Sequence, residues 1–176
     1  MTLAAVKDTL SKHEISFTQV EYDCEKSYLQ HVVMFPNIKN TSPHKVTALV
    51  IQSKNGKKDL ELQFVFKNGD FIFRELWFGS YCYEMFDYNE EQLSDALLSN
   101  ISEAMQGRIS VIVSNNLKKR KWNADAGFVL YDDSDKSEFE NAVRRIENKK
   151  PLIDRLFKAE YQYEIYNWDS YRLVIK

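Results

Sequence analysis

The segment from His44 to Asp87 constrains the fold more than any other, because three short turn sequences divide it into runs of strand-forming residues. Asn55-Gly56, Asn68-Gly69 and Gly79-Ser80 lie between runs rich in Val, Ile, Leu, Phe, Tyr and Trp. Asn-Gly tolerates the positive φ that both central residues of a two-residue hairpin adopt. The segment is therefore predicted to form an antiparallel meander. Its strand at 71–78 carries apolar residues at both parities, which indicates a central strand that is covered on both faces.

The rest of the chain contains three helix-like and five strand-like segments. Helices are predicted at Leu3–His13, at Glu90–Gln106 with Asn89 as the N-cap and Gly107 as the stop, and after the acidic turn Asp132–Asp135. Strands are predicted at 15–22, 109–113, 127–131, 161–166 and 171–175, the last two as a closing hairpin. Residues 24–35 fit either a helix or a strand, residues 36–43 read as a loop, and Pro151 is expected to open a short helix.

The order of these elements predicts the fold class. Strands and helices do not alternate as they do in a doubly wound sheet. We therefore expect an α+β fold, in which helices pack on a mostly antiparallel β-sheet built as a meander of hairpins. The length of 176 residues suits one domain spanning residues 1–176, with an N-terminal helix-and-strand appendage of residues 1–40 as the alternative.

Charge and composition argue against several classes of partner and location. A net charge of -2 gives no global field that would attract nucleic acid or anionic lipid, so neither is the expected partner. No apolar run approaches the ~20 residues that span a bilayer. The N-terminus lacks the apolar core of a signal peptide, and Cys24 and Cys82 form no disulfide framework. We expect a cytoplasmic chain with both thiols reduced.

No catalytic or metal-binding signature is visible. The three histidines lack the spacing of metal ligands, and no phosphate loop or nucleophile motif occurs. The acidic turn Asp132–Asp135 resembles half of a calcium loop. An EF-hand needs Gly at the sixth position and Glu at the twelfth, and counting from Asp133 these are Glu138 and Arg144. We expect no enzymatic activity and no cofactor, while a site assembled from distant residues stays open.

Two charged segments and the tyrosines are candidate contact surfaces. Acidic residues at Asp132–Asp135 offset the helix dipole, so a solvated helix start is their ordinary explanation and a contact surface the alternative. The basic run Lys118–Trp122 has three interpretations. A solvated loop ranks first, a protein-binding loop second and a nucleic-acid contact third. Most tyrosines are expected in the core or on the sheet surface, although Tyr and Trp are also enriched in protein interfaces.

Three blocks of the sequence carry a family resemblance. They are NGDFIFRELWFGSYCYEMFDYNEEQLSDALLSNISEAMQGRISVIV, KKRKWNADAGFVLYDD and the ending YEIYNWDSYRLVIK. In the order of its predicted elements and in its mixture of aromatic and acidic residues, the chain from about Lys67 onward resembles small bacterial proteins grouped with the immunity proteins of polymorphic toxin systems. The resemblance implies a cytoplasmic protein that binds one toxin domain and blocks it. It transfers no site residue.

The implied function needs a tight interface rather than chemistry, with aromatic anchors and complementary charge. Toxins that act on nucleic acids often have basic active sites, which acidic side chains of this chain could face. The hypothetical partner interface comprises Glu75, Glu84, Asp87, Trp122, Asp132, Asp133 and Asp135.

Three other classes of function compete with this hypothesis. The first alternative is a nucleic-acid-associated regulatory protein that uses the basic loop 118–122. An enzyme with an unrecognised site would gain weight from a pocket with two carboxylates of strongly shifted pKa. A structural subunit would associate with itself through an exposed sheet edge or aromatic patch. The oligomeric state and the identity of the toxin stay open.

Overall fold

The computed structural model describes residues 1–23, 45–83, 89–116, 128–150, 152, 156 and 160–175. The chain divides into two compact units. Unit 1 comprises Met1–Gln52 and Asp59–Ile101, and unit 2 comprises Ser53–Lys58 and Ser102–Lys176. Compactness does not measure independent folding, so the single-domain expectation stays a prediction.

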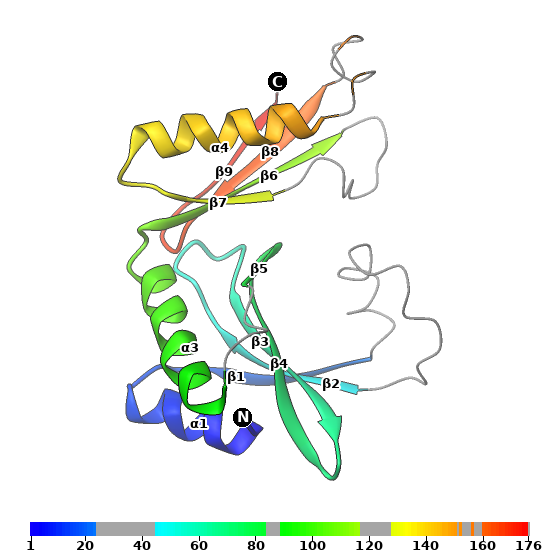
Figure 1. Ribbon diagram of the computed structural model, residues 1–176, viewed down its shortest axis with the longest axis vertical. Coiled ribbons are helices and arrows are strands. Elements are labelled where there is room, and N and C mark those ends of the chain that lie inside the picture. The colour runs from blue at the N-terminus through cyan, green and yellow to red at the C-terminus, as the bar shows by residue number, and fades with distance from the viewer. Residues whose placement is uncertain are drawn as a thin grey trace. The chain divides into compact units, whose positions relative to one another are not determined.

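Unit 1 is built on a five-stranded antiparallel sheet with the order β1-β2-β3-β4-β5 (Figure 1). The strands are β1 (Thr18–Asp23), β2 (Lys45–Ile51), β3 (Leu60–Lys67), β4 (Asp70–Phe78) and β5 (Tyr81–Tyr83). Helix α1 (Leu3–Lys12) precedes them and α3 (Glu90–Met105) follows. Residues 1–23 are therefore part of the unit, because β1 pairs with β2 and the fully buried Val6 and Leu10 anchor α1.

Two of the three predicted turns are two-residue hairpin turns. Asn68 and Gly69 join β3 to β4 with φ of 54° and 91°, as the Asn-Gly pattern predicts. Gly79, with φ of 56°, opens the turn between β4 and β5. Asn55-Gly56 behaves differently, since β2 ends at Ile51 and β3 begins at Leu60, which leaves a longer loop. The two-residue turn expected there is wrong.

The Asn55 side chain explains this longer loop. Its Oδ1 accepts hydrogen bonds from the backbone N–H groups of Lys57 (2.8 Å) and Lys58 (2.9 Å). Its Nδ2 donates to the carbonyl of Asn167 (2.6 Å), and its backbone N–H donates to the carbonyl of Trp168 (2.9 Å). Segment Ser53–Lys58 thus combines local hydrogen bonds with bonds to distant residues of unit 2 instead of closing a tight hairpin.

One face of the five-stranded sheet is an apolar core. Its residues lie in cross-strand rows, and each is at most 2% exposed: Leu49, Leu62 and Leu76 in one row, and Ile51, Leu60 and Phe78 in the next. Strand β4 is buried on its other face too, where Trp77 is 6% exposed. The expectation of a central strand covered on both sides is confirmed.

Unit 2 contains a four-stranded antiparallel sheet with the order β7-β6-β8-β9. Its strands are β6 (Ile109–Asn116), β7 (Phe128–Asp132), β8 (Tyr161–Tyr166) and β9 (Tyr171–Ile175). Helix α4 (Lys136–Lys149) packs on one face (Figure 1). The core between them consists of Ile112, Val129, Tyr131, Ala142, Ile146, Tyr161, Tyr163 and Ile165. The closing hairpin has the predicted bounds.

The helix ends follow the predicted capping chemistry. Thr2 Oγ1 accepts from Ala5 N (3.3 Å), and Asn89 Oδ1 accepts from Gln92 N (2.9 Å). Gln92 Oε1 accepts from Asn89 N (3.3 Å), which completes a capping box. Gly107 ends the turn after α3 with φ of 68°.

Two antiparallel sheets with packed helices confirm the α+β fold class. The ambiguous segment 24–35, the loop 36–43 and the start of the helix predicted at Pro151 lie outside the described residues. Within the part of the chain that the structure describes, no helix has the length and apolarity needed to cross a membrane.

Candidate functional site

The seven residues of the hypothetical interface do not all have a described position. Glu84, Asp87 and Trp122 lie outside the described residues, as does the basic run 118–122. Glu75 lies on β4 of unit 1, whereas Asp132, Asp133 and Asp135 lie together between β7 and α4 of unit 2. The part of the interface that can be built from geometry is therefore the acidic turn Asp132–Asp135.

Hydrogen bonds within the turn fix two of its three carboxylates. Asp132 Oδ1 accepts from Ser134 N (2.9 Å) and Ser134 Oγ (2.6 Å), and Asp135 Oδ1 accepts from Ser137 N (2.8 Å) and Ser137 Oγ (2.7 Å). These bonds, the side-chain hydroxyl first in each case, lower the pKa of both aspartates below the ordinary value. Both carboxylates are therefore ionised at neutral pH, and Asp135 is at the same time the N-cap of α4.

Asp133 completes the turn and ties it to the β8–β9 hairpin. Its Oδ2 accepts from Asn167 Nδ2 (3.1 Å), and its N–H donates to the carbonyl of Arg108 (2.7 Å). All three aspartates are exposed, and none forms an ion pair with a basic residue of the described segments. The turn is a fixed patch of three exposed negative charges that have no ion-pair partner among the described residues.

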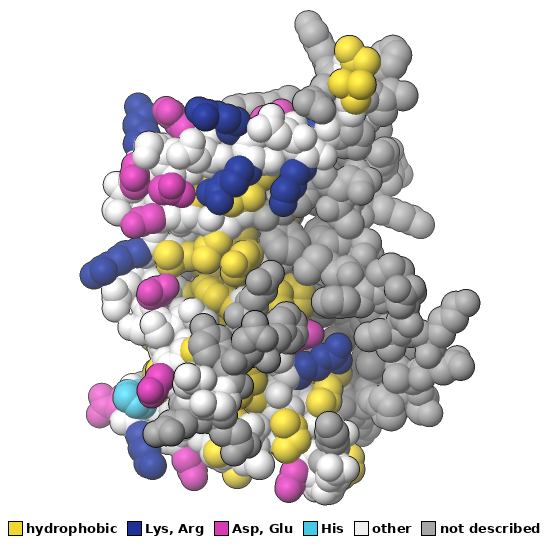
Figure 2. Space-filling model, viewed as in Figure 1, with side chains coloured by type: hydrophobic (Ala, Val, Ile, Leu, Met, Phe, Trp, Pro, Cys, Tyr) yellow, Lys and Arg dark blue, Asp and Glu magenta, His cyan; other side chains and the backbone are white. Residues whose placement is uncertain are grey.

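The neighbouring helix α4 has a different electrostatic character. Figure 2 shows Lys and Arg side chains interspersed with Asp and Glu along its surface. Arg145, for example, pairs with Glu138 (Nη2 to Oε2, 3.5 Å). This mixed face offers no single-sign field, so the acidic turn is the stronger electrostatic feature.

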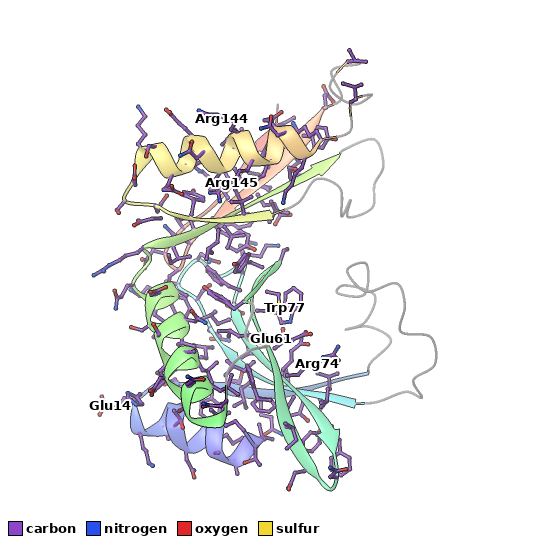
Figure 3. All side chains as sticks on the ribbon, in the orientation of Figure 1. Glu14, Glu61, Arg74, Trp77, Arg144 and Arg145 are labelled. Carbon is purple, nitrogen blue, oxygen red and sulfur yellow. The ribbon has the colours of Figure 1, made fainter. Side chains whose placement is uncertain are left out.

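Glu75 belongs to a separate and largely buried group on the second face of the five-stranded sheet. A bulge at Gln63/Phe64 leaves Arg74 without a cross-strand partner, and its Nε pairs with Glu75 Oε1 at 3.3 Å. The indole of Trp77 donates to Glu75 Oε2 at 3.0 Å. Figure 3 shows where Arg74 and Trp77 lie on β4. Glu75 is only 9% exposed, and its role in partner binding stays a prediction.

Glu61 and Gln63 extend this group, and we did not single them out from the sequence. In the register of β3 and β4, Glu61 is opposite Trp77 and Gln63 is opposite Glu75. Gln63 Nε2 donates to Glu61 Oε1 at 2.8 Å. Burial raises the pKa of the Glu61 carboxyl, which the Gln63 hydrogen bond partly offsets. The cross-strand register brings these residues together, and Gln63 is only 4% exposed.

The chemistry available to this group is proton transfer at one carboxyl. A raised pKa keeps the proton on Glu61 at higher pH than on an exposed glutamate. The competing enzyme hypothesis would gain weight from a pocket with two carboxylates of strongly shifted pKa, and Glu61 is a carboxyl whose pKa burial raises. Among the described residues, no group of three His, Cys, Asp or Glu side chains could hold a metal ion.

A third polar group lies inside unit 2, where α4 ends. Lys150 is 8% exposed and donates to Glu147 Oε1 at 2.8 Å and to the Tyr163 hydroxyl. That hydroxyl in turn donates to Glu147. The Lys150 ammonium also lies 4.0 Å from the centre of the Tyr161 ring, within range of a cation–π interaction. Burial raises the pKa of Tyr163, and the hydrogen bond to Glu147 raises it further. Tyr163 therefore stays protonated at neutral pH, and its hydrogen bonds join the end of α4 to β8.

Comparisons with protein-family models, with curated proteins and with solved structures find no match for this chain.

Proposed function

We propose that this chain is an immunity-type binding protein that forms a tight complex with a bacterial toxin domain and neutralises it. The acidic turn Asp132–Asp135 carries the proposal, because it presents three exposed carboxylates without a described counter-ion. The resemblance of the sequence from about Lys67 onward to immunity proteins supplies the class of partner.

The turn has properties that favour binding to a basic surface. Its carboxylates are held by Ser134, Ser137 and Asn167, so binding a cationic partner orders few additional side chains. Complementary charge accelerates association and excludes partners of the wrong sign. Proteins that act on nucleic acids carry Lys and Arg where they hold phosphates. A turn of this kind suits blocking such a site.

The decisive experiment identifies the partner and tests the consequence of binding. The tagged full chain is used as bait, and a protein that elutes in stoichiometric amount is identified by mass spectrometry. That protein is then expressed in bacteria with and without the chain. We expect growth to stop when it is expressed alone and to recover on co-expression. A partner that is harmless alone, or toxic in both cases, contradicts the proposal.

The contribution of the acidic turn is tested by removing charge without removing the cap. The triple variant D132N/D133N/D135N retains side-chain acceptors, and Asn is as good an N-cap as Asp. The matched control D8N/D70N/D95N removes three other exposed carboxylates. We expect the turn variant to bind the captured partner at least ten-fold more weakly, mainly through slower association at low salt. Equal affinity of turn variant and control would remove the turn from the interface.

A further inference from the structure

Strand β9 forms one edge of the four-stranded sheet and carries exposed apolar side chains. It pairs with β8 on one side and has no strand on the other within the described chain. Leu173 is 51% exposed and Ile175 is 65% exposed, and both lie on the face of the strand that also carries Tyr171. Natural proteins rarely leave an apolar edge uncovered, because its free backbone groups pair with other strands.

The hairpin turn shows which backbone groups face this open edge. Asn167 N donates to the carbonyl of Ser170 at 3.0 Å, which makes Asn167 and Ser170 a hydrogen-bonded pair. Hydrogen-bonded and non-hydrogen-bonded pairs alternate along an antiparallel ladder. Arg172 and Val174 therefore direct their N–H and C=O groups toward β8. The same groups of Tyr171, Leu173 and Ile175 point away from the sheet.

We propose that β9 pairs with β9 of a second copy of this chain, in antiparallel orientation and centred on Leu173. In this register Leu173 faces its symmetry mate, and Tyr171 faces Ile175 of the other copy. These residues carry the outward backbone groups, so each pair exchanges both of its N–H···O=C bonds. The proposal is independent of the proposed toxin partner, since it uses a different surface.

The side chains of β9 favour a second copy as the occupant of this edge. Leu–Leu and aromatic–β-branched pairs are among the favourable cross-strand combinations, and this register produces both. It also places Arg172 opposite Val174 of the other copy, so no two like charges face each other directly. Tyr171 is held in position by stacking on Tyr166 at a centroid distance of 6.4 Å. The strand is thus self-complementary in both hydrogen bonding and charge.

The symmetry and size of the contact follow from the same geometry. A two-fold axis perpendicular to the sheet at Leu173 would create one continuous eight-stranded sheet, with α4 of both copies on the same face. A single short strand pair buries less than the ~1,200 Å² typical of stable complexes. We therefore expect a reversible dimer whose population depends on concentration.

Light scattering coupled to size exclusion tests the dimer. The measured mass of the full chain should rise from 20.8 kDa toward twice that value as the loaded concentration increases. Leu173→Lys should keep the mass at 20.8 kDa at every concentration. Phe66→Lys is the matched control, because Phe66 is 62% exposed on β3, and it should behave like the unmodified chain. A chain that stays monomeric up to millimolar concentration, or a Leu173→Lys variant that still dimerises, overturns the proposal.

Cross-linking tests the register. In a background of Cys24→Ser and Cys82→Ser, Leu173→Cys should form an intermolecular disulfide under mild oxidation, because hydrogen-bonded pairs have Cα atoms about 5.5 Å apart. Arg172→Cys should not, since its symmetry mate is two residues out of register. Cross-linking at Arg172 and not at Leu173 would show that the register is wrong.

Discussion

The five-stranded sheet of unit 1 buries rows of leucine, isoleucine and phenylalanine, whereas the four-stranded sheet of unit 2 buries three tyrosines beneath α4. Rows of apolar side chains are stabilised by tight packing alone. A buried tyrosine also needs a partner for its hydroxyl, and Tyr163 obtains one from Lys150 and Glu147. The stability of the first core therefore depends on how completely its side chains fill the interior. The stability of the second core depends in addition on the protonation state of Tyr163.

The largest expected effect tests the packing of the first core. Leu76→Ala removes a fully buried side chain from the row that also contains Leu49 and Leu62. We expect the free energy of unfolding to fall by about 3 kcal/mol, since a cavity remains at the site. Urea unfolding followed by fluorescence, in a background that keeps only Trp77, measures the change. The comparison fails if the loss is below about 1 kcal/mol, the typical cost of an ordinary point mutation.

The next effect separates the two cores by pH. The neutral form of Tyr163 is favoured in the folded chain, because its raised pKa lies above the ordinary tyrosine value of about 10. Its contribution to stability is complete below pH 10 and is lost as pH rises further, by at most about 1.4 kcal/mol per pH unit. Tyr131 and Tyr171, whose pKa values burial also raises, add to this loss.

Unfolding at pH 8 and pH 11, followed in variants that keep only Trp77 or only Trp168, measures this difference. Trp168 lies in unit 2, so its transition should move to lower urea concentration at pH 11 by more than the Trp77 transition does. Tyr163→Phe should reduce the shift seen by Trp168. Equal shifts for both probes that Tyr163→Phe leaves unchanged would remove the distinction between the cores.

The smallest effect concerns the start of α4. Asp135→Ala removes the acceptor for Ser137 N and should lower the free energy of unfolding by about 1 kcal/mol. Asp135→Asn keeps the acceptor and should cost only a few tenths of that. Amide hydrogen exchange in α4 reports the change locally. If both variants lose protection equally, charge rather than capping stabilises this helix end.

Sequence patterns predicted the elements whose signals are local. The cap at Asn89, the turn at Asn68-Gly69 and the bounds of the hairpin 161–166/171–175 follow from neighbouring residues, and each is confirmed. Asn55-Gly56 carried the same turn signal, but distant carbonyls of Asn167 and Trp168 determine its conformation. Local propensity gives way where long-range hydrogen bonds compete with it.

The candidate sites show the same limit. The acidic turn was visible in the sequence because its three aspartates are almost consecutive. Glu61, Gln63 and Glu75 come from two strands, and only the cross-strand register brings them together. The division of the strands into two sheets likewise depends on the pairing of β6 with β8, which no local pattern encodes.

The segment Ser53–Lys58 has a consequence for how the chain is made. Asn55 precedes its partner Asn167 by 112 positions, so a ribosome adding 5–20 residues per second needs on the order of ten seconds to deliver that partner. Throughout that interval the first piece of unit 2 has been synthesised while the β8–β9 hairpin does not yet exist. A fragment beginning at Ser102 would lack this piece altogether, and unit 2 can be completed only after the β8–β9 hairpin has been synthesised.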